Sequence, residues 1–331
     1  MDVSNNTKAQ RLIDILMKYH RYSNTAMQRC HNGFCQSCQK QPREMIVQAI
    51  KKQQPLTLIL PAFPAKSANR QKTLSAKPDL GEKMGLANLN LLCQSLQHHH
   101  QPGVRLIICS DGRVFNDLVL VSNADVQTYQ QGIQQIINQD SLHFLSLFSL
   151  DDVYINDDFA TMREKLMQDF AEPLEELKQR IRCQSPSLYL FNGIHRFIVE
   201  DQLALKPLQS KNQTRLQAKE VTYEVIRRSN AWSKLLATSF PEALRLSIHP
   251  QPCGSDKLGI QFLPAKNGWA TPWHNVLLKN RDGWQLMKRL DAERLGARLN
   301  DDHYVLESDM VFAGEREETG LKSSLFPLGS F

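Results

Sequence analysis

Short apolar runs that alternate with helix-like stretches constrain the fold of this chain more than any other feature. Residues 56–60, 104–109 and 142–150 are such runs, and their length suits strands buried on both faces of a sheet. The intervening stretches 81–97 and 124–138 carry apolar residues at helical spacing. Strands that alternate with helices predict a parallel sheet. We therefore expect an α/β fold, Rossmann-like, with a mostly parallel sheet flanked by helices.

Further elements are expected before and after this repeating pattern. Residues 8–22 carry apolar side chains at helical spacing, and two longer helical stretches cover about 158–182 and about 214–239. The apolar run 187–191 between them resembles a strand. From 244 to about 304 the segments become shorter, with Gly and Pro between them, which suits antiparallel strands added to the sheet.

These patterns divide the chain into three expected parts. Residues 1–44 form an N-terminal helical, cysteine-bearing appendage, residues 45–275 an α/β catalytic core, and residues 276–331 a C-terminal extension. A length of 331 residues fits one large domain with extensions or two ordinary domains, because single cores stop growing near this size.

Composition and charge narrow the class of protein. The formal charge is +6, but Lys and Arg are scattered without a dense basic stripe, so a small anionic metabolite is a simpler partner than nucleic acid. A noncatalytic module that binds a phosphate metabolite or nucleic acid remains the alternative from another class. We find no apolar run long enough for a membrane span and no secretory leader, and we expect a cytoplasmic protein. Seven irregularly spaced cysteines then predict reduced thiols without a structural disulfide.

Polar side chains follow each predicted strand. In open α/β sheets the ligand lies in the crevice beyond the carboxyl ends of the strands. The loops at those ends carry Lys66, Ser67, Asn69, Arg70, Ser110, Asp111, Asp151 and Asp152. We expect these residues to converge on one rim of the sheet.

Three of these residues have chemistry that suits catalysis or anion binding. Lys66 and Arg70 could bind a phosphate, and Lys66 could also donate a proton; the alternative is a solvated surface loop. Asp111 could act as a general base or as the carboxylate partner of a lysine. The alternative for Asp111 is a turn former, because it precedes a glycine as in a tight hairpin.

Further downstream, Arg245, Ser247 and His249 alternate with apolar residues, so on a strand the three would share one face. An arginine could grip a phosphate or carboxylate there while the histidine transfers protons near neutral pH. The alternative is a solvent-facing side of the strand.

Several other polar and aromatic residues could have either a functional or a purely structural role. His195 and Arg196 follow an Asn-Gly turn, and His274 follows Trp273, so each histidine is either functional or simply structural. Ser229 and Ser233 could cap a helix start whose free N–H groups face a phosphate. Three of the four tryptophans could wall an aromatic pocket or belong to the core, namely Trp232, Trp269 and Trp273.

A cysteine-bearing segment near the N-terminus invites a zinc interpretation. It contains Cys30, His31, Cys35 and Cys38. Cys30 and His31 are adjacent, and no second ligand pair mirrors this one, whereas most structural zinc sites use two separated pairs. We therefore expect no metal.

A series of blocks in this sequence then resembles one known family. The blocks are 60–67 with Asn69, 78–82, 110–115 with Asp117, 192–197 with Asp201, 228–233, 240–241, 245–251 and 271–275, followed by a C-terminal stretch at 287–298. In this order they resemble the pyoverdine/dityrosine biosynthesis family, whose characterised bacterial members are isonitrile (isocyanide) synthases. The resemblance spans roughly residues 45 to 300 and rests on many blocks.

The resemblance implies a lyase-type condensation of an aromatic L-amino acid with D-ribulose 5-phosphate, in which the ketone carbon of the sugar becomes the isonitrile carbon. Tyrosine is the expected amino acid, with tryptophan left open. No metal or redox cofactor is implied. Expected partners are the small-molecule substrates, a pathway oxygenase that acts on the product, and a second copy of the chain in a possible homodimer. N-formyl or N-acyl transfer to tyrosine is the alternative within the family.

Residue chemistry and resemblance together give one set of candidates. Catalysis is assigned to Lys66, Asp111, His249 and His195. Substrate binding is assigned to Ser67, Asn69, Arg70, Ser110, Arg196, Ser229, Ser233, Arg245, Trp273 and His274.

Overall fold

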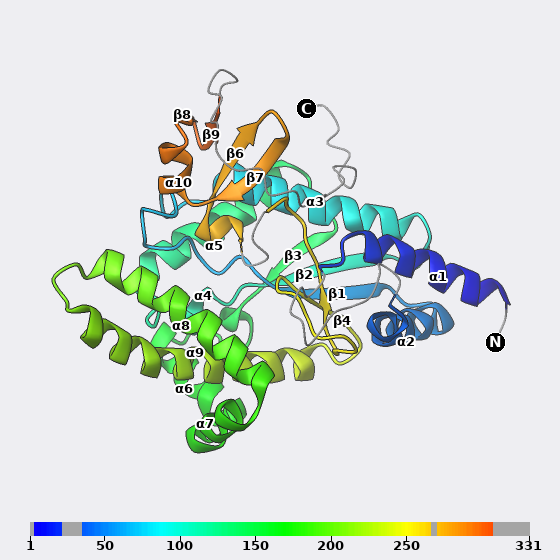
Figure 1. Ribbon diagram of the computed structural model, residues 1–331. Coiled ribbons are helices and arrows are strands. Elements are labelled where there is room, and N and C mark those ends of the chain that lie inside the picture. Colours follow the sequence, from blue (N-terminus) through cyan, green and yellow to red (C-terminus); the bar gives the residue numbers. More distant parts are fainter. Residues whose placement is uncertain (1–2, 22–34, 266–269, 307–331) are drawn as a thin grey trace.

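A five-stranded parallel sheet forms the centre of the molecule (Figure 1). The computed structural model describes residues 3–21, 35–265 and 270–306. The strands of this sheet are β1 (Leu56–Pro61), β2 (Val104–Cys109), β3 (Leu145–Phe148), β4 (Leu244–Ser247) and β5 (Leu258–Gly259). Their order is β3-β2-β1-β4-β5, and every neighbouring pair is parallel. The predicted α/β fold with a mostly parallel sheet is confirmed.

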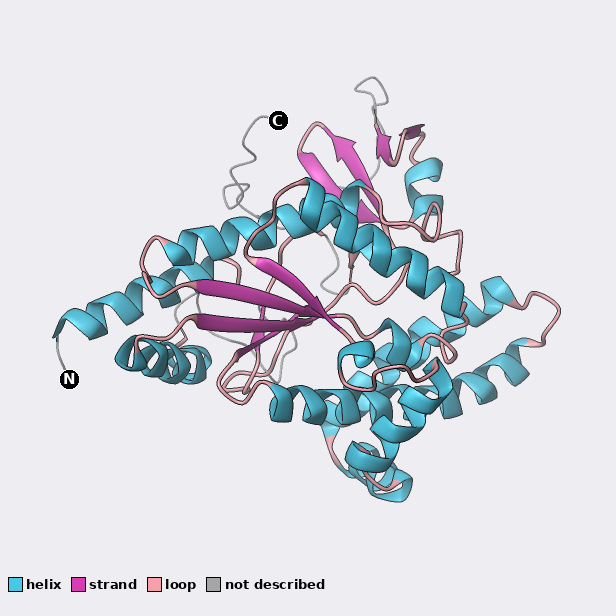
Figure 2. Ribbon diagram, turned by 180° about the vertical axis from the view of Figure 1, so that it is seen from behind, coloured by secondary structure: helices cyan, strands magenta, loops and turns pink. Residues whose placement is uncertain are grey.

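Helices cover both faces of this sheet, as Figure 2 shows from behind. Side chains such as Leu58 and Leu106 point to one face and pack with α1 (Val3–Lys18), α3 (Leu80–Gln97) and α5 (Asn123–Gln139). Ile59 and Ile107, one position along each strand, point to the other face and pack with α6 (Phe159–Phe170) and α9 (Lys211–Ser239). The apolar runs are therefore continuous because each strand is buried on both sides.

The remaining elements extend this core at its two ends. Helix α2 (Gln36–Lys52) packs against α1. Four strands form a separate mixed sheet in the order β7-β6-β9-β8. They are β6 (Val276–Asn280), β7 (Gly283–Met287), β8 (Arg298–Asn300) and β9 (His303–Val305), with α10 (Arg289–Arg294) before β8. Pairs β6/β7 and β8/β9 are antiparallel and β6/β9 is parallel.

Part of the prediction for the last third of the chain is wrong. Antiparallel strands were expected from residue 244 onwards, but β4 and β5 join the main sheet in parallel. The antiparallel pairs lie further on, in the separate sheet. Short strands with Gly and Pro between them have the same local pattern in either orientation, so the sequence does not fix their direction.

Two predictions of local structure between β3 and β4 are also wrong. The single helix at 158–182 is two helices, α6 and α7 (Leu174–Cys183), which Pro173 separates because proline disfavours the helical conformation before it. The strand expected at 187–191 is helical and begins α8 (Ser185–Leu205). A five-residue apolar run is ambiguous between strand and helix, and here tertiary packing of α8 on α9 decides.

Helices α8 and α9 also replace an expected turn and an expected helix cap. The Asn-Gly turn before His195 lies inside α8, and Ser229 and Ser233 lie inside the uninterrupted helix α9. No free helix start exists at these serines, so the expected cap facing a phosphate is wrong. Among the described residues, no helix has the length and apolar character that crossing a membrane requires.

Candidate active site

The strand order creates a switch point between β1 and β4. The chain proceeds from β1 outwards to β2 and β3, and then returns to place β4 on the other side of β1. At such a point the loops at the carboxyl ends of the two central strands diverge, and a crevice forms between them. Lys66 follows β1, Asp111 follows β2 and His249 follows β4, so these residues leave three adjacent strands at the same edge.

The loops after β1 and β2 touch each other directly. Ser110 donates a hydrogen bond from its hydroxyl to the carbonyl of Phe63 over 2.8 Å. A Cβ atom on Gly112 would lie 2.1 Å from the carbonyl oxygen of Pro64, so only glycine permits this approach. The Asp111-Gly112 pair therefore serves close packing of two loops and the start of the short helix α4 (Gly112–Phe115), and the alternative of a tight hairpin is wrong.

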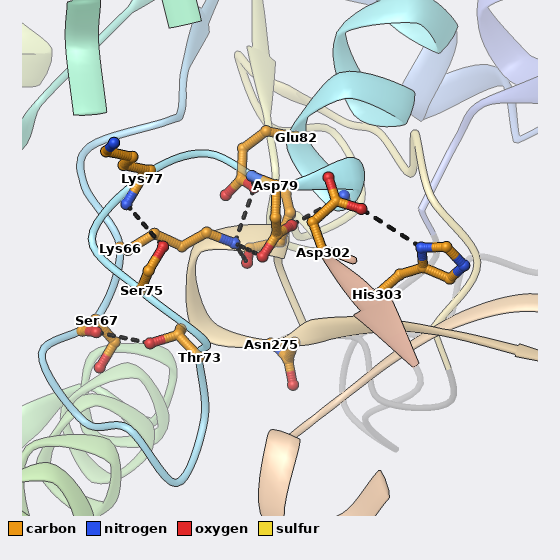
Figure 3. Close-up of polar contacts among 12 residues, drawn as sticks. Lys66, Ser67, Thr73, Ser75, Lys77, Asp79, Glu82, Asn275, Asp302 and His303 are labelled. Atoms are coloured by element: carbon orange, nitrogen blue, oxygen red, sulfur yellow. Dashed lines mark hydrogen bonds and ion pairs between the residues drawn. The ribbon is translucent and has the colours of Figure 1, made fainter. Parts of the chain in front are cut away.

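Lys66 lies at the centre of a buried ion cluster (Figure 3). Its Nζ is 2.6 Å from Asp79 Oδ2 and 2.8 Å from Glu82 Oε2, and it donates a hydrogen bond to the carbonyl of Pro272 over 2.9 Å. The residue is only 1% exposed. Tyr129 completes the cluster, because its hydroxyl donates to Glu82 Oε1 over 3.0 Å. Lys66 is therefore an interior cation, which rules out the alternative of a solvated surface lysine.

The start of α3 holds the two carboxylates in place. Asp79 is the N-cap of this helix, and its Oδ1 accepts from the backbone N–H of Gly81 over 2.9 Å. Glu82 in turn accepts from the backbone N–H of Asp79 over 3.0 Å, which completes a capping box. The D-x-x-E spacing in the sequence was the available signal for this pair, although Asp79 and Glu82 were not among the predicted site residues.

Burial and the close approach of charged groups shift the pKa values of several members of this cluster upwards. Burial alone would lower the pKa of Lys66, but the charges of Glu82 and Asp79 outweigh burial and raise it. Burial and the charge of Glu82 raise the pKa of Asp79 well above its ordinary value. Burial and Glu82 also raise the pKa of Tyr129 well above its ordinary range. One lysine cation thus faces two carboxyl groups, and burial together with the charge of Glu82 favours the protonated form of Asp79.

Asp111 combines burial with a titration range close to neutral pH. Burial raises the pKa of its carboxyl group to about 7. The negative charge of Asp111 contributes to raising the pKa values of Cys109 and Tyr129, which places it within electrostatic range of the Lys66 cluster. A carboxylate that exchanges its proton near pH 7 is suited to general acid/base chemistry.

Two histidines in this region, His249 and His274, have lowered pKa values. Burial, followed by the charge of Arg21, lowers the pKa of His249 to about 4. Burial lowers the pKa of His274 well below its ordinary value, and the charges of Lys72, His249 and Lys66 lower it further. Both imidazoles are therefore uncharged at neutral pH, and His274 lies within electrostatic range of the other three residues.

A second buried ion pair joins the β1 loop to α8. Lys72 Nζ is 2.7 Å from Asp201 Oδ1, and the same carboxylate oxygen accepts from Asn69 Nδ2 over 2.9 Å. The ammonium group also lies 4.1 Å from the ring centroid of Phe197, whose ring is 4.5 Å from that of His274. Sequence reasoning missed Lys72, because nothing in the local pattern separates it from a surface lysine.

A basic pair lies beside β4 and α9. The guanidinium of Arg245 donates to the hydroxyl and carbonyl oxygens of Ser233, and Lys257 Nζ donates to the same hydroxyl over 3.1 Å. Burial, followed by the charge of Arg245, lowers the pKa of Lys257. Asp256 lies 3.3 Å from Arg245, but its side chain is 66% exposed. Arg245 and Lys257 repel each other, and Asp256 is the exposed carboxylate beside them. An anion bound between the two cations would relieve this repulsion.

The other predicted residues divide into those near this crevice and those away from it. Ser67 donates its backbone N–H to the carbonyl of Trp273 over 2.9 Å, and Trp273 packs on Phe63 with ring centroids 5.2 Å apart. Arg70 is exposed and donates to the carbonyl of Ser67 and the hydroxyl of Thr73, so it braces its own loop.

Two candidates on α8 and one on α9 are not brought to the crevice. His195 Nε2 lies 3.2 Å from the carbonyl of Arg215 on α9. Phe197, two positions further along α8, faces His274, and residues two apart on a helix point to nearly opposite sides. Arg196 and Ser229 are exposed.

Of the three candidate tryptophans, Trp232 packs in the core on Phe148, with ring centroids 5.9 Å apart, on the opposite face of the sheet from Trp273. Trp269 lies outside the described residues. The expected aromatic wall is therefore not formed by Trp232 and Trp273 together.

A groove opens near the second ion pair. Its volume is about 560 Å³, and it lies between the segment after α4 and helices α8 and α9. It is lined by Asp117, Leu118, Leu120, Gln202, Lys206, Leu216, Gln217, Glu220 and Val221. A narrow space that shares Leu118, Leu120 and Gln202 with this groove reaches Phe197 and Asp201. The groove thus leads from the surface towards the Lys72 pair.

Comparisons with known proteins agree with this architecture. Residues 46–299 match the family described as pyoverdine/dityrosine biosynthesis protein. The chain is 40% identical over 280 residues to the L-tryptophan isonitrile synthase AmbI2 of Fischerella ambigua, covering 85% of each protein. It is 41% identical over 250 residues to the L-tyrosine isonitrile synthase of Pseudomonas aeruginosa, covering 74% of this chain and 76% of that protein. The crystal structure of the PvcA protein of Pseudomonas aeruginosa superposes with a TM-score of 0.85 at 36% identity, covering 90% of this chain and 99% of that one.

Proposed function

The chain belongs to the pyoverdine/dityrosine biosynthesis protein family, and we propose that it is an isonitrile synthase that condenses an aromatic L-amino acid with D-ribulose 5-phosphate. Relatives of about 40% identity that carry the name isonitrile synthase support the reaction class. The observation that carries the proposal for this chain is Asp111, a carboxyl group with a pKa of about 7 within electrostatic range of the buried Lys66 cluster.

The proposed reaction moves protons at each stage, and the crevice has groups for this. The amine of the amino acid attacks the ketone of the sugar, water leaves to give an imine, and the carbon–carbon bonds flanking the former ketone carbon then break. Asp111 would accept protons in these steps, because its carboxylate forms near neutral pH. Lys66, held between Asp79 and Glu82, would supply protons to the imine side.

Arg245 and Lys257 are the groups that we propose to hold the phosphate of the sugar. They already converge on the hydroxyl of Ser233, so both donors are directed to one point. A phosphate there would accept charge-assisted hydrogen bonds from both cations. The neutral imidazoles of His249 and His274 would offer a donor or acceptor without adding positive charge.

Tyrosine is the amino acid that we propose. Relatives named for tyrosine and for tryptophan are about equally similar to this chain, so a product assay has to include both. A pathway oxygenase that acts on the isonitrile, and a homodimer, also belong to this proposal.

A product assay tests the reaction. The protein would be incubated with tyrosine, tryptophan or phenylalanine and with ribulose 5-phosphate labelled with ¹³C at the ketone carbon. We expect an isonitrile with tyrosine, seen by its infrared stretch and by a mass that contains the labelled carbon. N-formyltyrosine or an N-acyl product would favour the family alternative and overturn the proposal, and an isonitrile from tryptophan alone would change the substrate but not the reaction.

The phosphate site has its own test. Lys257→Met should raise the KM for ribulose 5-phosphate roughly 10- to 150-fold, the range for one lost charge-assisted hydrogen bond of about 1.5–3 kcal/mol. Lys219→Met is the matched control, because Lys219 is exposed on α9. A KM for the sugar phosphate that is equal in both variants would remove Lys257 from the site.

A further inference from the structure

Three cysteines from distant parts of the chain meet at the N-terminus of α2. Cys35 is the N-cap of this helix and Cys38 lies in its first turn, whereas Cys253 lies in the segment between β4 and β5. All three sulfur atoms lie within 4.8 Å of one another. Cys253 Sγ is 3.1 Å from Cys35 Sγ and 3.8 Å from Cys38 Sγ, across 218 and 215 positions of sequence. The fold therefore completes a set that the sequence presents only as a C-x-x-C pair.

The spacing of the sulfur atoms suits a shared soft metal ion. With Zn–S bonds of about 2.3 Å, the sulfur atoms of a tetrahedral zinc site are about 3.8 Å apart. The Sγ atoms of Cys38 and Cys253 have this separation, and those of Cys35 and Cys253, at 3.1 Å, are within about 1 Å of it. A covalent disulfide needs about 2.05 Å, well below either distance.

The local electrostatics also favour negative sulfur ligands. Helix α2 has 17 residues, and its first turn contains no acidic side chain. The positive end of the helix dipole is therefore not compensated by a carboxylate there, and thiolates would take that place. Cys38 is buried, Cys35 is half-buried and Cys253 is exposed, so an ion could reach the set from solvent and then be partly enclosed.

We propose that Cys35, Cys38 and Cys253 bind a zinc ion as thiolates, and that this ion fastens the start of α2 to the segment after β4. Binding would release the thiol protons to solvent, and no electron transfer is involved. The fourth coordination position would be taken by water or by another ligand. Among the residues considered from sequence, Cys30 and His31 lie outside the described part of the chain.

The proposed ion would act on the active site through the backbone. Cys253 follows His249 by four residues in the same segment. This segment is tightly packed, since a Cβ atom on Gly259 would lie 2.8 Å from the carbonyl oxygen of His249 and 3.1 Å from that of Arg21. A metal at Cys253 would therefore restrict the segment that positions His249, without touching a substrate. The proposal concerns structure and does not depend on which reaction the enzyme catalyses.

Metal content and cobalt substitution test this site directly. The full chain would be purified under reducing conditions, and its zinc content would be measured by plasma mass spectrometry. The metal-free protein would then be titrated with Co²⁺, whose thiolate complexes give a charge-transfer band and whose tetrahedral sites give strong visible bands. We expect one zinc per chain and a Co²⁺ spectrum that saturates at one equivalent and is displaced by Zn²⁺.

Single variants identify the ligands. Cys253→Ser and Cys38→Ser should lose the charge-transfer band and the bound zinc, whereas Cys183→Ser should retain both, because Cys183 is exposed at the end of α7. If a ligand variant does not fold, the titration of the wild-type chain still decides. A wild-type chain that binds no Zn²⁺ or Co²⁺ more tightly than the Cys35→Ser/Cys38→Ser/Cys253→Ser variant overturns the proposal. A Cys35–Cys253 disulfide found by peptide mass analysis of protein purified without added reductant would overturn it as well.

Discussion

Replacing Asp111 with asparagine should stabilise the fold at neutral pH while it impairs catalysis. Burial moves the pKa of this carboxyl group from 3.8 to about 7. At 1.36 kcal/mol per pH unit, this difference corresponds to about 4 kcal/mol that the folded state loses when Asp111 ionises. Asparagine has a similar shape and cannot ionise, so the variant should not carry this cost.

The pH dependence fixes the sign of the effect. Below about pH 4 the carboxyl group is protonated in both the folded and the unfolded chain, and it contributes no difference in stability. Between about pH 4 and pH 7 the unfolded chain releases the proton and the folded chain keeps it, so the stability of the wild type falls as pH rises. Above about pH 7 the cost is constant. Asp111→Asn should therefore exceed the wild type by about 2–4 kcal/mol at pH 8 and equal it near pH 4.

Urea unfolding of both proteins from pH 4 to pH 8 measures this difference. Asp282→Asn is the control, because Asp282 is exposed in the turn between β6 and β7 and should give no difference that varies with pH. In parallel, the wild-type rate should rise through about pH 7 as Asp111 ionises, and Asp111→Asn should lose about 10²- to 10⁴-fold in kcat. Identical pH profiles of stability for Asp111→Asn and the wild type would refute the reasoning from burial.

Three further variants test the packing around this residue. Lys66→Met should lower the free energy of unfolding by about 3–5 kcal/mol, because it leaves two buried carboxyl groups without their cation. The control Lys51→Met, at an exposed position, should change this free energy by less than about 0.5 kcal/mol. Equal urea midpoints for the two variants would contradict the buried ion pairs of Lys66. Tyr129→Phe should lower the free energy of unfolding by about 1–3 kcal/mol, since it removes the hydroxyl that donates to the buried Glu82 side chain. Calorimetry measures this loss, which would be smaller if a water molecule took the place of the hydroxyl. Gly112→Ala should lower the free energy of unfolding by about 1–3 kcal/mol and reduce turnover, because its Cβ would lie 2.1 Å from the Pro64 carbonyl oxygen. A Gly112→Ala variant with the thermal stability of the wild type would show that the loops after β1 and β2 are not in contact.

The core of the fold could be predicted from sequence because its signals are local. A strand buried on both faces must be apolar at nearly every position, as in 56–60 and 104–109, and these runs coincide with β1 and β2. Local signals fail where one pattern serves two structures. The run 187–191 is apolar as a strand would be, yet it lies in α8, where Phe191 is buried and Tyr189 is exposed.

The sequence by itself determined that polar loops would follow the strands of a parallel sheet, and it indicated Lys66 and Asp111 among them. Only the tertiary structure decided what surrounds these residues. The partners of Lys66 come from the cap of α3, Lys257 joins Arg245 across a loop, and Cys253 reaches a C-x-x-C pair more than 200 positions away. Periodicity indicates which way a side chain faces on its own helix or strand. A pKa, an ion pair or a set of metal ligands depends instead on atoms a few ångströms away in space, and those atoms belong to segments that are distant in the sequence.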